Sequence, residues 1–203
     1  MIEVSGRETQ NEGTNALPIF RSSHPRIIFL SGGRFAGAPE QSELFLCAED
    51  WVSQDLKSCP WHQGMIAAGP KVFGTWRIRA KRAGVYRVEV RRWPREIDAP
   101  LAGVPAPRTG RPDAWLEGKP VDNLLYGGTP QALPVARIGL TISGRSQECA
   151  VKSTDGAAIF EVDLPPGEHT VDARLIDASG QDIAGAYYVY IRPAAKSERT
   201  LSK

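Results

Sequence analysis

The sequence contains no apolar run that approaches the roughly 18–20 residues of a membrane-spanning helix. It also lacks an excess of one charge, because 25 basic and 23 acidic residues leave a net charge of +2. No run of Lys or Arg is longer than three residues. We therefore expect neither a nucleic acid nor a membrane as a partner.

The N-terminus, MIEVSGRETQNEGTN, lacks the basic n-region and the apolar core of a secretory signal. As written, the chain is expected in the cytoplasm. The alternative is that the true start lies upstream of Met1 and that the protein is exported, so localisation remains unknown at this point.

The residue patterns of common catalytic and metal sites are missing as well. The sequence contains no G-x-S-x-G and no H-E-x-x-H motif, and its three cysteines and three histidines do not have the spacing of zinc ligands. A disulfide between Cys47 and Cys59 is left open, although their spacing does not favour it. We expect no metal, no cofactor and no catalytic residue in this chain.

Turn-forming residues are abundant: 16 prolines and 20 glycines divide the chain into short segments. Alternating or compact apolar segments predict strands at 26–30, 42–48, 75–81, 85–93, 135–143, 157–164, 169–177 and 185–192. No segment has a convincing helical stripe. The pattern predicts an all-β fold, an antiparallel β-sandwich that is jelly-roll-like, with one long Pro- and Gly-rich loop at 98–134.

The domain organisation follows from where the alternation begins and ends. Residues 1–25 are polar and aperiodic and predict a flexible arm, and residues 194–203 predict a disordered tail. Residues 26–70 form a linking segment with short strands, which we expect to face a partner. Residues 71–193 are expected to form the sandwich.

The stretch GTWRIRAKRAGVYRVEVRRWPRE, residues 74–96, predicts a β-hairpin with its turn at Ala83-Gly84. Alternation places Arg91 and Arg92 on opposite faces of the second strand. We expect Arg92 to pair with Glu96 or Asp98 beneath the long loop. The alternative is that Trp93 caps the core and both arginines are solvated.

The last predicted strand contains AYYVYI, with Tyr188 and Tyr190 on one face and Tyr187, Val189 and Ile191 on the other. A central strand that is covered on both faces would explain this composition. The alternative is a tyrosine-lined platform for a glycan.

Several short motifs occur in an order that resembles the C-terminal region of bacterial arylsulfatase-type sulfatases. The matching residues are Asp50 and Trp51, Trp61 and Gln63, Gly74 and Trp76, Gly84 and Tyr86, Arg91, Arg92, Trp93 and Pro94 with Glu96, and Gly185 to Tyr190 with Tyr187 and Tyr188. The resemblance covers about residues 26–192. Each motif alone is weak, and the shared order carries the likeness.

The family's catalysis depends on an N-terminal α/β domain that carries calcium ligands and a C/S-x-P-x-R motif, which is matured to formylglycine. Here Cys59-Pro60-Trp61 lacks the spacing and the arginine of that motif. The resemblance therefore implies a non-catalytic accessory module that docks to a sulfatase catalytic domain. The linking segment would then expose apolar side chains, among them Ile27, Phe29 and Trp51.

Two other functions are weighed against this one. A stand-alone carbohydrate-binding module would bind a glycan through exposed aromatic residues such as Trp61, Trp115 or Tyr126. Catalysis by the chain itself is the third hypothesis.

Overall fold

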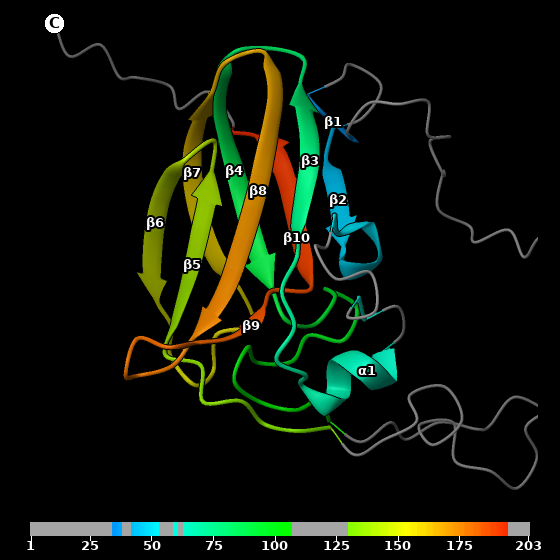
Figure 1. The fold of residues 1–203 in the computed structure, drawn as a ribbon, viewed down its shortest axis with the longest axis vertical. Coiled ribbons are helices and arrows are strands. Elements are labelled where there is room, and N and C mark those ends of the chain that lie inside the picture. The colour runs from blue at the N-terminus through cyan, green and yellow to red at the C-terminus, as the bar shows by residue number, and fades with distance from the viewer. Residues whose placement is uncertain (1–33, 38–41, 53–58, 61–62, 107–129, 195–203) are drawn as a thin grey trace, which may run out of the picture. The chain divides into compact units, whose positions relative to one another are not determined.

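The computed structural model describes residues 34–37, 42–52, 59–60, 63–106 and 130–194. These residues form two β-sheets, drawn in Figure 1. The first, sheet A, has the order β1-β3-β8-β5-β6, and β9 also pairs with β8. The second, sheet B, has the order β2-β10-β4-β7.

The strands of sheet A are β1 (Arg34–Ala36), β3 (Thr75–Ala80), β5 (Arg137–Ile142), β6 (Arg145–Ala150), β8 (Gly167–Ile176) and β9 (Asp182–Gly185). Those of sheet B are β2 (Leu44–Cys47), β4 (Gly84–Arg91), β7 (Ala158–Leu164) and β10 (Tyr188–Pro193). Two short helices, η1 (Ala48–Asp50) and α1 (Gln63–Ala68), complete the described elements. Every strand pairing is antiparallel except that of β1 with β3, so the predicted all-β sandwich is confirmed.

Alternation along the strands produces the core. In β3 the buried residues Trp76, Ile78 and Ala80 alternate with the more exposed Thr75, Arg77 and Arg79. The same alternation occurs in β4, β7 and β8, and the buried faces of both sheets contribute to one hydrophobic cluster. A two-layer sandwich buries one face of each sheet, which is the face that a period of two supplies.

The stretch 74–96 is not a hairpin, because β3 belongs to sheet A and β4 to sheet B. Residues 81–83 form a corner between the two sheets, and Gly84 is the first residue of β4 rather than a turn residue. The hydroxyl of Tyr86 donates a hydrogen bond to the Arg82 carbonyl at 2.8 Å, the arrangement known as a tyrosine corner. Two consecutive strands show the same apolar alternation whether they pair in one sheet or belong to different sheets. The sequence pattern therefore predicted a hairpin here.

The sequence patterns also missed β1, β6, β9 and α1. Strand β6 is an almost fully exposed edge strand, so it has no apolar alternation to detect. It pairs with β5 through the two-residue turn Ser143-Gly144, in which both residues have positive φ, 53° and 77°. Two consecutive positive φ values match the twist of a tight hairpin, and Gly144 adopts this conformation without strain.

The predicted division at residue 71 does not appear, because residues before it are part of the sandwich. Strand β1 pairs with β3, and β2 pairs with the central strand β10. Trp51 is only 7 % exposed, so the prediction that it lies on an exposed partner-facing surface is wrong. The predicted strand at 26–30, the residues Ile27 and Phe29, the arm 1–25 and most of the tail lie outside the described residues.

Side chains from sheet A close the edges of sheet B. Along β2, the Phe45 carbonyl accepts a hydrogen bond from Arg34 at 2.8 Å, and the Cys47 carbonyl accepts one from the Trp76 indole at 2.7 Å. On the opposite edge, Gln147 donates to the Glu161 carbonyl of β7 at 3.3 Å. Edge carbonyls that are occupied in this way are not open to another strand.

Candidate functional site

Trp51 lies in a slot that two glycines leave open. A methyl group on Gly74 would overlap the Trp51 ring, and one on Gly185 would lie 3.0 Å from it. The Trp51 ring meets Trp76 edge-on at 5.7 Å between centroids and stacks on Tyr187 at 6.0 Å. Three separate motifs of the sequence therefore meet at one place, which we call the Trp51 cluster: Trp51, Gly74, Trp76, Gly185 and Tyr187.

Hydrogen bonds to main-chain carbonyls attach the Trp51 cluster to its surroundings. The Gly185 amide donates to the Val72 carbonyl at 2.8 Å, and the Tyr187 hydroxyl donates to the Pro70 carbonyl at 3.3 Å. Burial raises the pKa of Tyr187 to about 12, so this hydroxyl remains protonated and can donate at neutral pH. The cluster is an interior packing unit rather than a surface for a ligand.

Arg92 is fully buried beneath the beginning and end of the long loop. Its guanidinium donates to the carbonyls of Gly103, at 3.1 Å, and Gln131, at 2.6 Å, and lies 4.5 Å from the centroid of the Trp93 ring. Trp93 is buried too, and its indole N–H shares the Gly103 carbonyl at 3.3 Å. Burial lowers the Arg92 pKa to about 10.

This arrangement corrects the prediction for Arg92. Its hydrogen bonds go to main-chain carbonyls, whereas Glu96 and Asp98, the predicted partners, are exposed. The alternative predicted that Trp93 caps the core and that both arginines are solvated. It is wrong for Arg92, which is buried, and right for Trp93, which does cover the core. Two carbonyls that lie 28 residues apart in sequence (131 − 103) need a planar donor with several N–H groups, which arginine provides.

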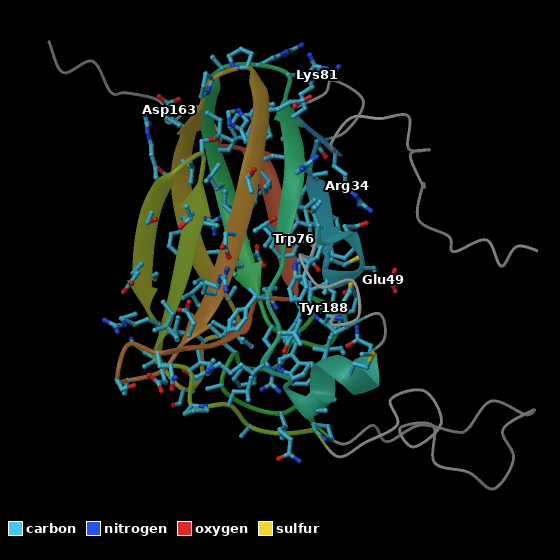
Figure 2. All side chains as sticks on the ribbon, viewed as in Figure 1. Arg34, Glu49, Trp76, Lys81, Asp163 and Tyr188 are labelled. Carbon is cyan, nitrogen blue, oxygen red and sulfur yellow. The ribbon has the colours of Figure 1, made fainter. Side chains whose placement is uncertain are left out.

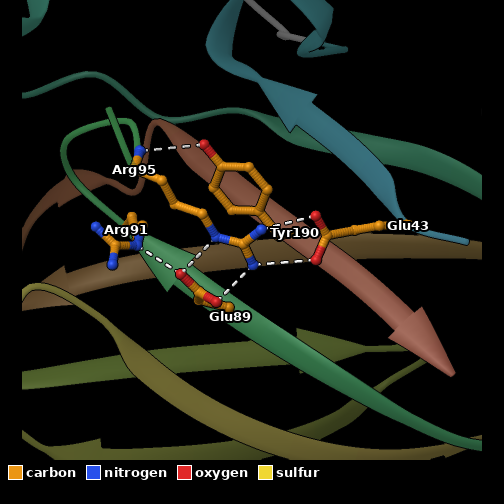
Figure 3. Close-up of polar contacts among 5 residues, drawn as sticks. All are labelled: Glu43, Glu89, Arg91, Arg95 and Tyr190. Atoms are coloured by element: carbon orange, nitrogen blue, oxygen red, sulfur yellow. Dashed lines mark hydrogen bonds and ion pairs between the residues drawn. The ribbon is translucent and has the colours of Figure 1, made fainter. Parts of the chain in front are cut away.

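A second group, the Arg95 network, lies on the outer face of sheet B (Figure 3). It consists of Glu43, Glu89, Arg91, Arg95 and Tyr190. Arg95 forms two hydrogen bonds to Glu43, at 2.7 and 3.0 Å, and two to Glu89, at 2.6 and 3.0 Å. Its guanidinium lies 3.9 Å above the Tyr190 ring, and Arg91 donates to Glu89 at 2.5 Å.

The charges of the Arg95 network compensate one another. Burial by itself would raise the pKa of Glu89, but hydrogen bonds from Arg95 and Arg91 outweigh it and leave the pKa below its usual value. The hydrogen bonds that Arg95 donates to Glu89 in turn raise the pKa of Arg95. The network thus joins β4, the residue before β2 and the segment after Trp93. Its two acids balance its two arginines, so it needs no external ion for charge balance.

The tyrosines of β10 are covered on both faces, as the central-strand interpretation predicts. Tyr188 is 5 % exposed and Tyr190 is 7 % exposed. Gln63, the first residue of α1, donates to the Tyr188 hydroxyl, and Phe45 packs beside both rings. The alternative of a tyrosine-lined glycan platform is wrong for these rings, because a sugar could not reach their faces.

Cys47, whose carbonyl accepts the Trp76 indole hydrogen bond, is not arranged as a nucleophile. Burial, followed by the nearby Asp50 carboxylate, raises the pKa of Cys47 to about 12, and Asp50 is itself ion-paired with Arg34. Burial, followed by the nearby carboxylates of Glu49 and Asp50, raises the pKa of Cys59, and the three cysteines are free thiols. Within the described ranges, no group of three or more His, Cys, Asp or Glu side chains could hold a metal ion.

The part of the chain that the structure describes contains one hydrogen-bonded serine–histidine pair. Ser143 Oγ lies 2.5 Å from His169 Nδ1, and His169 Nε2 donates to the Pro165 carbonyl at 2.9 Å. The pair ties the β5–β6 turn to the corner between β7 and β8. We interpret it as a structural contact because the third partner is a main-chain carbonyl and Ser143 stands at an exposed turn.

The structure separates the predicted site residues into three groups. Trp51, Trp76 and Tyr187 belong to the Trp51 cluster; Arg91 and Tyr190 belong to the Arg95 network; Asp50, Gln63, Arg92, Trp93 and Tyr188 support the surrounding loops and α1. Trp61, Trp115 and Tyr126 lie outside the described residues. Glu43, Glu89 and Arg95 were not predicted as site residues from the sequence. Glu89 and Arg91 are two residues apart, so alternation places them on one face of a strand. This spacing could have indicated an ion pair between them.

The structure is therefore a two-sheet β-sandwich whose interior is filled by side chains of both sheets. No protein-family model matches the chain, and no curated protein matches it. Among solved structures, the chain is similar to a ruminal GH26 endo-β-1,4-mannanase, with 12 % identity and a TM-score of 0.41. The match covers 78 % of this chain and 27 % of the mannanase chain. Among the described residues, no helix is long and apolar enough to cross a membrane.

Proposed function

We propose that this chain is a non-catalytic β-sandwich module that accompanies an arylsulfatase-type catalytic domain. The observation that carries the proposal is the Trp51 cluster. The Asp-Trp, Gly-x-Trp and Gly-Ala-Tyr-Tyr motifs, on which the resemblance rests, meet in one interlocked packing unit. Motifs that depend on one another for packing are what a shared fold requires, which supports a common architecture with the sulfatase C-terminal region.

The chemistry of the described residues supports a non-catalytic role. The motif residues contribute to packing and loop support, and the Cys47 thiol is protonated at neutral pH because its pKa is about 12. Sulfate-ester hydrolysis in the family needs an activated nucleophile and a metal. The Cys59-Pro60 segment offers neither, since burial also raises the pKa of Cys59.

The direct test uses a bacterial arylsulfatase that has been cut before its own C-terminal region. We expect the purified 203-residue chain to bind this truncated enzyme with a Kd of about 10 μM or tighter, measured by calorimetry, as is typical of a specific domain interface. The matched control is the same enzyme with its C-terminal region intact, because its docking surface is then occupied. Equal binding to both enzymes, or to neither, would contradict the proposal.

A second measurement tests the proposal that this chain is not catalytic by itself. The chain alone should leave p-nitrophenyl sulfate unhydrolysed in the presence of calcium. Turnover that follows the protein through purification would overturn this part of the proposal and revive catalysis by the chain itself.

Carbohydrate binding remains a second candidate function, and the outer face of sheet A is the observation that favours it. The tyrosines of β10 are buried, so a glycan would have to bind elsewhere. Exposed arginines and hydroxyl groups stand side by side on β3 and β8.

A further inference from the structure

Strand β3 carries an outward row of bases that the overall charge of the chain does not reveal. Arg77 and Arg79 are exposed and stand two residues apart, so their Cα atoms are separated by about 7 Å along the strand. Lys81 follows at the end of β3, where Figure 2 labels it. On the neighbouring strand β8, Thr170 stands opposite Arg77 and Glu168 opposite Arg79.

Most acids on this face are already neutralised. Asp172 accepts hydrogen bonds from Arg174, one of them at 2.6 Å, and Glu148 pairs with Arg137 at 3.5 Å. Neither Arg77 nor Arg79 forms an ion pair with any residue that the structure describes. Glu168 is therefore the one described acid that directly opposes the two arginines, and this end of sheet A keeps a positive excess.

From this juxtaposition we propose that the outer face of β3 binds the sulfate or carboxylate groups of an acidic polysaccharide. The two guanidiniums form hydrogen bonds to oxyanions in a planar, bidentate geometry. The Thr170 hydroxyl, exposed beside Arg77, supplies a polar contact for a sugar hydroxyl. The Thr75 hydroxyl on the same face of β3 donates to the Val52 carbonyl at 3.4 Å, so it can offer a sugar only an acceptor. The strip is extended and suits a polymer with repeated anionic groups better than a single ion.

A polysaccharide fits this face better than a nucleic acid does. Binding of single-stranded nucleic acids relies on aromatic rings that stack on bases. Phe73 stands two residues before the start of β3, and the Arg174 guanidinium lies 4.5 Å from the centroid of its ring. Such a covered ring is not free to stack on a base.

The experiment compares two double variants of equal charge change. The test variant is Arg77→Gln with Arg79→Gln. The control is Arg87→Gln with Arg192→Gln, whose arginines stand opposite each other on the outer face of sheet B. The probes are a heparin fragment, a hyaluronan fragment of the same length and a single-stranded DNA oligonucleotide, each measured by calorimetry at low and moderate salt.

We expect the wild-type chain to bind the heparin or the hyaluronan fragment, with an affinity that decreases as salt increases. The test variant should bind about tenfold more weakly and the control less than about twofold more weakly, because two charge-assisted contacts are lost only in the first. Preference for heparin would assign the site to sulfate groups, and equal affinity for hyaluronan would assign it to carboxylates as well.

Three outcomes would overturn the inference: no polysaccharide binding at low salt, equal losses in both double variants, or tighter binding of the DNA. Thermal unfolding of both variants checks that they are folded, and the test variant should keep the wild-type Tm because Arg77 and Arg79 are exposed. The assay needs no sulfatase domain, so its result is independent of the proposed docking.

Discussion

At the scale of single residues, the position of Trp51 depends on two glycines. Gly74 and Gly185 come from distant parts of the chain and leave the space that the indole fills. The Trp51 ring can then reach both Trp76 and Tyr187, and such aromatic contacts stabilise a core beyond the area they bury. Arg92 has a comparable role for the long loop, because one side chain holds carbonyls from both of its ends.

Replacement of Gly74 by alanine should destabilise the protein by about 1–3 kcal/mol, because the new methyl group overlaps the Trp51 ring and forces the core to shift. Urea unfolding followed by tryptophan fluorescence measures the change. Gly156→Ala is the matched control, since a methyl group there meets its nearest atom, the Ala99 carbonyl oxygen, at 3.4 Å. Similar losses in both variants would mean that the slot around Trp51 is not tight.

Arg92→Lys should lower the free energy of unfolding by about 2 kcal/mol or more, because an ammonium group keeps the cost of a buried charge but cannot bond to both carbonyls. The exposed Arg79→Lys serves as the control and should change stability by less than about 0.5 kcal/mol. Chemical denaturation measures both values. An Arg92→Lys variant as stable as the wild type would show that the planar guanidinium is not required.

At the scale of elements, strands and their connections are held by polar contacts that cross between them. Arg34, Trp76 and Gln147 close the edges of sheet B, and Tyr86 fixes the corner between β3 and β4. The Arg95 network joins β4 to the residue before β2. Most of these bonds end on main-chain carbonyls, whose positions depend on how the strands are arranged in space, so residue spacing does not reveal them.

The Arg95 network predicts a dependence of stability on pH. The pKa of Glu89 is lower in the folded protein than its usual value of 4.5, so the folded state binds this proton less readily than the unfolded state does. The stabilisation is therefore complete above about pH 5 and is lost as the pH falls through the folded-state pKa. In Glu89→Gln, the free energy of unfolding should decrease less steeply between about pH 5 and pH 3.

Denaturant titrations at several pH values test this prediction. Exposed Glu161→Gln on the neighbouring strand β7 is the control and should retain the wild-type slope. If the Glu89 variant kept the same acid slope as the wild type, the network would not contribute to stability.

At the scale of the whole molecule, residues before position 71 are part of the sandwich. Strand β2 covers one side of the central strand β10, and Trp51 packs against Trp76 and Tyr187. A boundary at residue 71 would leave β10 with an open edge and remove a tryptophan from the core. Loss of a buried tryptophan side chain alone costs about 3–5 kcal/mol, a large part of the stability of an ordinary domain.

A chain that starts at residue 71 should therefore fail to show cooperative thermal unfolding, whereas one that starts at Gly32 should unfold with a Tm close to that of the full chain. Near-UV circular dichroism, which reports on packed aromatic rings, distinguishes the two. A folded product from residue 71 onward would contradict the assignment of β1 and β2 to the sandwich.

The sequence by itself determined the secondary structure of most strands and the all-β class. Local properties, which are apolar alternation, compact apolar runs and turn residues, placed β2, β3, β4, β5, β7, β8 and β10 close to their observed positions. The exposed edge strand β6 and the three-residue β1 were missed because an edge strand needs no apolar face.

Only the tertiary structure decided which strands share a sheet and what the distinctive side chains do. The corner at residues 81–83, the burial of Trp51 and the hydrogen bonds of Arg92 to Gly103 and Gln131 all depend on contacts between residues far apart in sequence. The row formed by Arg77 and Arg79 was visible in the sequence, but its charge balance was not. That balance depends on which acids of sheet A already have partners, and strand pairing sets those partners.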